Sequence, residues 1–241
     1  MFDLHFHSTC SDGKLSVSEL ATIIIERRLK FCALTDHDTV EGFKELQERL
    51  DGSGTTLITG TELTALYRKN EVHILAYDFD IDAVAAILKE RNDIVWSQKC
   101  EEMKEAVRLF RADGFHVSDG LVPAHKKPVG LTVALDVYNN LANQALLIER
   151  HGQLIDHQTF FETYQAEGKN CATERSGVEF EWLVNKFKGI AKDIVIAHPF
   201  VPVSFFVKPL EEQHILELID LGATGIEVYH DKTSKEPVGL L

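Results

Sequence analysis

The chain has 241 residues, of which 44% are hydrophobic and 26% charged, and its formal net charge is -13. This balance is typical of a folded globular protein and excludes a disordered chain. The acidic charge argues against a long nucleic acid as partner, because sequence-independent binding of nucleic acids depends on basic surface. No apolar stretch approaches the roughly 20 residues that span a bilayer. The four cysteines form no CxxC pair, so we expect reduced thiols in a cytoplasmic protein without a membrane partner.

The first residues, MFDLHFHSTCSDGK, carry the most informative chemical pattern of the chain. They predict an apolar strand on which His5 and His7 point to the same side. The Ser/Gly turn that follows can return the carboxylate of Asp12 to the two imidazoles. Nitrogen and carboxylate groups that converge in this way predict a metal site. Taken alone, the His-x-His pair fits ordinary surface or core histidines equally well.

Helices and strands then alternate along the chain. Residues Ser16 to Glu19 form a capping box, which predicts a helix that ends near Lys30. The other predicted helices lie near residues 41–51, 82–91, 177–190 and 209–220, and the predicted strands lie at 31–35, 56–61, 72–79, 193–198 and 224–229. Strands separated by helices of this length predict parallel βα units.

The middle of the chain has a different periodicity. Apolar residues recur at helical spacing at Met103, Ala106, Val107 and Phe110. Further helices are predicted at 130–142 and 157–166, without comparable strands. We therefore predict a helical insertion at residues 94–170, between α/β segments at 1–93 and 171–241.

Histidine and acidic residues recur near the ends of the predicted strands. His37 follows the strand at 31–35, and His198 ends the strand at 193–198. Glu62 follows the run at 56–61, and His73 opens the run that continues to Tyr77. Functional sites of barrels and open parallel sheets are built where strand ends share one face. The recurrence therefore favours one shared metal cluster over scattered histidines.

Five segments resemble the signature blocks of the PHP (polymerase and histidinol phosphatase) family, most closely its stand-alone bacterial phosphoesterases that act on small nucleotides. They are His5–Gly13, Leu34–Gly42, Gly60–Ala65, Glu71–Tyr77 and Ile196–Pro199, in the family's order. The middle of the chain resembles the family only loosely. The resemblance implies an α/β fold, namely a distorted and incomplete (β/α)7-type barrel, with the insertion as a cap over its mouth.

The resemblance also implies two or three divalent transition-metal sites. His5 and His7 would hold one metal, Glu62 would bridge two, and His73 and His198 would complete the second. Asp12 and His37 would belong to a third. A mixed set of nitrogen and oxygen ligands suits Mn²⁺, Zn²⁺ or Fe²⁺. Glu62, Asp12 and His198 are the expected catalytic residues. Asp36 and Asp38 either orient ligands from outside the cluster or cap a loop.

The chemistry expected of such a cluster is phosphoester hydrolysis by metal-activated water. The resemblance implies a metal-dependent phosphoric ester hydrolase whose substrates are small phosphorylated nucleotides, either nucleoside 3′,5′-bisphosphates or short oligoribonucleotides. Arg175 is a candidate phosphate-binding residue, and a solvated arginine before a helix is the alternative; Lys126 and Lys127 are weaker candidates. Two other functions stay open: a weak or inactive relative that binds metal or a phosphometabolite, and a histidinol-phosphate-type phosphatase.

The chain departs from the family pattern at its C-terminal end. Family members normally continue to a last strand with Gly-x-Asp-x-His, which serves two metals, whereas this chain ends at Leu241 without that motif. We therefore expect weaker metal binding at His5/His7 and at Asp12/His37. His230 and Asp231 are candidate replacements. We also expect the edge beside residues 224–229 to be covered or paired, for which a homodimer is one remedy.

Overall fold

The protein, as a computed structural model that describes residues 1–124, 127–201 and 209–229, folds into two compact units. The first comprises Met1–Asn92 and the described residues from Val178 onward, and the second comprises Asp93–Gly177. Helix α3 (Ile81–Ala112) contributes its first part to one unit and its remainder to the other. Among the described residues, no helix is both long and apolar enough to cross a membrane.

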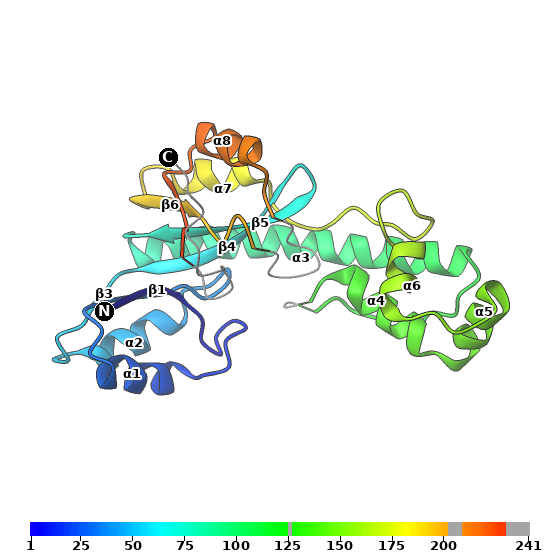
Figure 1. Cartoon of the computed structure of the whole chain (residues 1–241), viewed down its shortest axis with the longest axis horizontal. Helices are drawn as coiled ribbons and strands as arrows, with labels where there is room; N and C mark the ends of the chain where they lie inside the picture. Colours follow the sequence, from blue (N-terminus) through cyan, green and yellow to red (C-terminus); the bar gives the residue numbers. More distant parts are fainter. Residues whose placement is uncertain (125–126, 202–208, 230–241) are drawn as a thin grey trace. The chain divides into compact units, whose positions relative to one another are not determined.

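The N-terminal part of the first unit is a three-stranded parallel sheet with two helices on one side (Figure 1). Its strands, in spatial order, are β1 (Phe2–Phe6), β2 (Phe31–Leu34) and β3 (Thr56–Leu57). Helices α1 (Val17–Glu26) and α2 (Gly42–Leu50) pack against it through buried apolar side chains such as Ile24, Leu34 and Leu46. This arrangement agrees with the βα units predicted for this segment.

The predicted start of α1 is confirmed. The Ser16 hydroxyl accepts a hydrogen bond from the amide of Glu19 at 3.3 Å, and the Glu19 carboxylate accepts one from the amide of Ser16 at 2.8 Å. This reciprocal pair satisfies two amides that the first turn of a helix leaves without partners. The helix ends at Glu26, before the predicted end, and Arg28 adopts a φ of 52°.

The second sheet of this unit mixes strand directions, so the parallel βα units predicted from the sequence do not extend to all of its strands. Its strands are β4 (Gly60–Tyr67), β5 (Asn70–Tyr77), β6 (Asp193–Ile196) and β7 (Gly225–Ile226), in that order. β5 is antiparallel to both β4 and β6, whereas β6 and β7 are parallel. Only two residues, Arg68 and Lys69, join β4 to β5, and a parallel connection needs a crossover of a dozen or more residues.

Helices α7 (Phe180–Phe187) and α8 (Glu212–Asp220) complete the described part of the first unit. The mixed α/β class agrees with the prediction. The described strands form separate sheets of three and four strands, and the seven-stranded barrel stays a prediction. β7 covers two residues of the strand predicted at 224–229.

The second unit is helical, and no strand lies among its described residues. Besides α3 it contains α4 (Val129–Asn139), α5 (Leu141–His151) and α6 (His157–Tyr164), around a core that includes Phe110, Phe115 and Phe160. The helix predicted at 130–142 is divided at Asn140, whose side chain accepts from the amide of Ala142 at 2.9 Å and so caps α5. The unit begins at Asp93 and ends at Gly177, whereas the sequence placed these limits at 94 and 170. Its role as a cap stays a prediction.

The two sheets of the first unit meet at the ends of β2 and β4. A parallel bridge joins His37 to Glu62, and the amide of Glu62 donates to the carbonyl of Thr35 at 3.2 Å. The Tyr77 hydroxyl donates to the carbonyl of Leu4 at 2.7 Å and so links β5 to β1. The end of β2 and the start of β4, which carry His37 and Glu62, therefore lie next to each other.

Candidate metal centre

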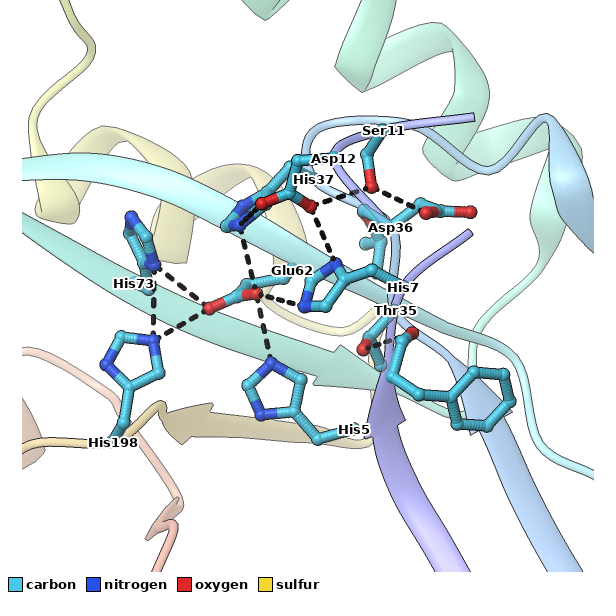
Figure 2. A network of polar contacts seen from close by, with 12 residues as sticks. His5, His7, Ser11, Asp12, Thr35, Asp36, His37, Glu62, His73 and His198 are labelled. Carbon is cyan, nitrogen blue, oxygen red and sulfur yellow. Dashed lines mark hydrogen bonds and ion pairs between the residues drawn. The ribbon is translucent and has the colours of Figure 1, made fainter. Parts of the chain in front are cut away.

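Glu62 lies at the centre of the site, with only 1% of its side chain exposed, and five histidine rings surround its carboxylate (Figure 2). The Oε2 atom faces the Nε2 atoms of His5, His7 and His37, at 3.0, 3.0 and 3.4 Å. The Oε1 atom faces His73 Nδ1 and His198 Nε2, both at 3.0 Å. The two oxygens of one carboxylate thus divide the histidines into two groups, as a ligand that bridges two metals requires.

These histidines lie on, or shortly after, four different strands of the two sheets. His5 lies on β1 and His7 directly follows it, while His37 lies in the loop after β2. His73 lies on β5, and His198 follows β6. The five histidines and Glu62, which the sequence predicted to converge, therefore lie close together. That they bind metal stays a proposal.

Asp12 lies at the solvent side of the cluster, with 64% of its side chain exposed. Its Oδ1 atom is 3.5 Å from His7 Nδ1, and its Oδ2 atom is 3.9 Å from His37 Nε2. The turn that returns Asp12 depends on Gly13, because a Cβ atom there would lie 2.2 Å from the carbonyl oxygen of His7. Asp12, His7 and His37 form a third group of candidate ligand atoms, all within 4.8 Å of one another.

Asp36 holds the loop that carries Asp12. Its carboxylate accepts from the amide of Ser8 at 2.7 Å, from the Ser8 hydroxyl at 2.6 Å and from the Ser11 hydroxyl at 2.5 Å. Asp36 is buried and points away from the ring cluster toward these groups (Figure 2). It therefore acts as a loop anchor, which is one of the two roles that the sequence left open.

Asp38 anchors the loop that carries His37, and sequence reasoning missed its partner. Its Oδ1 atom accepts from the amide of Thr64 at 2.9 Å, and its Oδ2 atom lies 3.1 Å from the guanidinium of Arg91. Arg91 is buried on α3 and also donates to the carbonyl of Thr64 at 2.8 Å. Asp38 itself has a φ of 55°, so these contacts hold a backbone conformation that non-glycine residues rarely adopt.

The electrostatics of the cluster favour bound cations. Burial raises the pKa of Glu62, but hydrogen bonds from His198, His5 and other rings outweigh it and hold the pKa well below its ordinary value. Burial lowers the pKa of His5, but hydrogen bonds to Glu227 and Glu62 raise the pKa to about 10. The pKa of His73 is also raised to about 10, because hydrogen bonds to Glu62 and Glu71 outweigh burial. Without metal, protons on the rings balance the carboxylates, and metal ions can replace such protons.

The donor atoms fit divalent transition metals. His73 Nδ1 and His198 Nε2 lie 3.2 Å apart, close to the roughly 3.3 Å expected between two ligand atoms of a tetrahedral zinc site. His37 Nδ1 is buried with no hydrogen-bond partner among the described residues. Imidazole nitrogen combined with carboxylate oxygen suits Mn²⁺, Zn²⁺ or Fe²⁺.

Two further acidic residues of the site were not found from the sequence. Glu227, directly after β7, lies 2.8 Å from His5 Nδ1, and Glu71 on β5 lies 3.2 Å from His73 Nε2. The one available signal was an acidic residue inside or beside an apolar strand, which is too common to single out a site. Glu227 contacts His5 through the packing of separate strands, and Glu71 contacts His73 through the rotamer of a side chain on the same strand.

Arg175 lies in the second unit and is half-buried. Its role as a phosphate-binding residue stays a prediction, as does that of Lys127. Lys126, His230 and Asp231 lie outside the described residues.

Part of the chain matches a known family model, and two relatives are similar over most of its length. Residues 3–112 match the model of the PHP domain. The chain is 26% identical over 198 residues to a 5′-3′ exoribonuclease of Haemophilus influenzae, covering 82% of this chain and 68% of that protein. It is 28% identical over 229 residues to a 3′,5′-nucleoside bisphosphate phosphatase of Chromobacterium violaceum, covering 94% of this chain and 75% of that protein.

A solved structure is similar over a comparable length. An amidohydrolase from Chromobacterium violaceum with bound sulfate superposes with a TM-score of 0.56 at 26% identity, covering 94% of this chain and 76% of that one. The similarity extends well beyond the segment that the family model matches.

Proposed function

We propose that the protein is a metal-dependent phosphoesterase that hydrolyses small phosphorylated nucleotides, and the match of residues 3–112 to the PHP domain model supports this. The observation that carries the proposal is the division of five histidines between the two oxygens of Glu62, a buried carboxylate. Nucleoside 3′,5′-bisphosphates and short oligoribonucleotides are the proposed substrates. The names of the two relatives, a bisphosphate phosphatase and an exoribonuclease, support this substrate class.

The proposed ligands follow the geometry of the cluster. His5 and His7 would share one metal with Glu62 Oε2, and His73 and His198 would share another with Glu62 Oε1. Asp12, His37 and His7 would hold a third. Divalent metals at such sites neutralise phosphate oxygens and activate water near neutral pH.

Three side chains of the site have distinct proposed roles. Glu62 stays ionised, since its pKa is held low, and its two oxygens fix the positions of the two groups of proposed ligands relative to each other. Asp12 is the exposed member of the cluster, so it can contact a substrate that enters from solvent. The ring of His198 contacts Glu62 and its amide donates a hydrogen bond to Glu227, so its position in the site is fixed. We propose these as the catalytic residues.

The charge of the site supports short substrates over long ones. The carboxylates of the centre repel phosphate unless cations are bound, and the chain as a whole carries a net charge of -13. A nucleotide with a terminal phosphate can reach bound metals through that one group, whereas a long polyanion also needs a basic track.

The second unit is proposed to act as a cap, with Arg175 as a phosphate contact. Arginine can grip a phosphate through two parallel hydrogen bonds, which is a specific way to hold a terminal phosphate. The second unit is joined to the first at Asn92/Asp93 and at Gly177/Val178.

A panel of substrates tests the proposal. The purified chain, loaded in turn with Mn²⁺, Zn²⁺ and Fe²⁺, would be incubated with adenosine 3′,5′-bisphosphate, a 5′-phosphorylated oligoribonucleotide and histidinol phosphate. We expect phosphate or nucleotide release from the first two, and none from a matched Glu62→Gln sample. Preference for histidinol phosphate would indicate the other phosphatase class. Metal-loaded, folded protein without turnover on any substrate would indicate an inactive relative.

A further inference from the structure

We propose that Glu227 and Glu71 are positioning residues that set which ring nitrogen His5 and His73 present to the metals. The inference rests on the proposed metal centre and adds an outer layer to it. It predicts that the two histidines bind through opposite ring nitrogens, Nε2 for His5 and Nδ1 for His73.

The His5 ring lies between two carboxylates. Its Nδ1 atom is 2.8 Å from Glu227 Oε1, and its Nε2 atom is 3.0 Å from Glu62 Oε2. An ionised carboxylate can only accept a hydrogen bond, so the contact with Glu227 places a proton on Nδ1. The nitrogen that remains for a metal is Nε2, which points to the centre of the cluster (Figure 2).

The His73 ring has the reverse arrangement. Its Nε2 atom is 3.2 Å from Glu71 Oε1, while its Nδ1 atom is 3.0 Å from Glu62 Oε1 and 3.2 Å from His198 Nε2. Glu71 and His73 are two apart on β5, so their side chains share one face of the strand. Glu71 therefore holds the outer nitrogen and leaves Nδ1 for the metal. Both outer carboxylates are largely buried, with side chains 14% and 11% exposed for Glu71 and Glu227.

Glu227 has a second contact, to the backbone of His198. Its Oε2 atom accepts a hydrogen bond from the amide of His198 at 2.7 Å. His198 has a φ of 31°, in the left-handed region that non-glycine residues rarely occupy. Glu227 thus holds the ring of a ligand on one side of Glu62 and the backbone of a ligand on the other side.

The two outer residues should therefore have different effects on metal binding. Loss of Glu71 should disturb the metal at Glu62 Oε1, because its carboxylate contacts the ring of His73. Loss of Glu227 should disturb both metals, through His5 and through His198. Removal of an outer carboxylate of this kind typically lowers metal affinity by about 10- to 100-fold.

Nuclear magnetic resonance of the wild-type chain and of two variants tests the inference. The protein would be labelled with ¹⁵N-histidine and loaded with Zn²⁺, and long-range ¹H–¹⁵N spectra would identify the metal-bound nitrogen of each ring. We expect one ring with a protonated Nδ1 and a metal-bound Nε2, and one ring with the reverse pattern. In Glu227→Gln and Glu71→Gln samples, the N–H signal of the first and second ring, respectively, should shift. Metal-bound Nε2 on both rings would overturn the inference.

Metal affinities provide the second test. Glu227→Gln, Glu71→Gln and the exposed control Glu48→Gln would be titrated with Zn²⁺ against a chelator, with folding followed by circular dichroism. We expect one weakened site for Glu71→Gln, two for Glu227→Gln and none for Glu48→Gln. Folded variants of Glu227 and Glu71 with wild-type affinities would refute the inference while the proposed function stands. A wild-type chain that binds no metal would refute both.

Discussion

Glu62 is the residue on which the two groups of histidines depend. Both oxygens of its buried carboxylate are in use, each facing rings from a different set of strands. Any change that keeps the size of this side chain and removes its charge should therefore affect both proposed metal positions together.

Glu62→Gln should reduce hydrolysis by at least about 100-fold, because the proposed metal ligand would serve two ions and loss of an outer carboxylate alone reaches that size. The fold should be retained, since the amide has nearly the same shape. Steady-state kinetics on adenosine 3′,5′-bisphosphate, with circular dichroism as a check on folding, measure this. Glu48→Gln, an exposed change of the same chemistry, is the control. Near-normal turnover by folded Glu62→Gln would remove Glu62 from the centre.

The residues of the inner cluster could be predicted from sequence, whereas their outer partners could not. His5, His7, His37 and His198 stand beside apolar runs that end at one face of a sheet, and this pattern is visible in a single chain. Glu227 and Arg91 act through contacts with residues far away in sequence. Such partners are determined by packing, which leaves no spacing in the sequence.

At the scale of elements, loops that carry ligands are tied to the strands beside them. The loop after β2 is held by Asp38, which binds Thr64 of β4 and Arg91 of α3. The arrangement positions His37 relative to Glu62, which lies at the start of the same β4 strand.

Arg91→Met should destabilise the chain by about 2–4 kcal/mol, because it leaves the Asp38 carboxylate without its cation in a poorly solvated place. Urea denaturation of the metal-free protein measures the loss. The double change Asp38→Asn with Arg91→Met should recover part of it, since the unpaired charge is then absent. An Arg91→Met variant as stable as the wild type would show that the ion pair does not hold the loop.

The hairpin between β4 and β5 was not predicted, for an identifiable reason. Two-residue hairpin turns usually contain Asn-Gly or Asp-Gly, whereas this turn is Arg68-Lys69, with φ of 49° and 65°. Without a turn signal, β4 and the start of β5 could be taken for a loop.

Lys69→Gly should stabilise the chain by about 0.5 kcal/mol, because glycine adopts a positive φ without steric cost. Thermal unfolding would show a small rise in the midpoint temperature. Lys69→Ala, which removes the same side chain and keeps the strain, is the matched control and should give no rise. Equal effects of the two substitutions would mean that the turn stores no strain.

At the scale of the whole molecule, the second unit was correctly predicted to be helical, but the ends of its helices were placed wrongly. The apolar spacing around Phe110 indicated helix, but the start at residue 81 was not connected to it, so α3 was expected to stop near residue 91. The division between α4 and α5 rests on the single cap at Asn140. Helical periodicity reports that a helix exists more reliably than where it ends.

Arg175→Ala should raise KM for a nucleoside bisphosphate by about tenfold with little change in kcat, if Arg175 grips a phosphate that does not react. Arg175→Lys should fall between, because lysine keeps the charge and loses the paired hydrogen bonds. Initial rates over a range of substrate concentrations give both constants. Unchanged kinetics in both variants would show that Arg175 does not contact the substrate.

The central claim is that Glu62 bridges two metal ions, and anomalous X-ray diffraction from crystals grown with Mn²⁺ or Zn²⁺ tests it most directly. With the metal in excess, the account predicts one strong anomalous peak between Glu62 Oε1 and the rings of His73 and His198, and a weaker one between Oε2 and the rings of His5 and His7, where the missing C-terminal ligands lower the affinity. A single peak, or metal bound away from Glu62 in a crystal whose centre is intact, would contradict it.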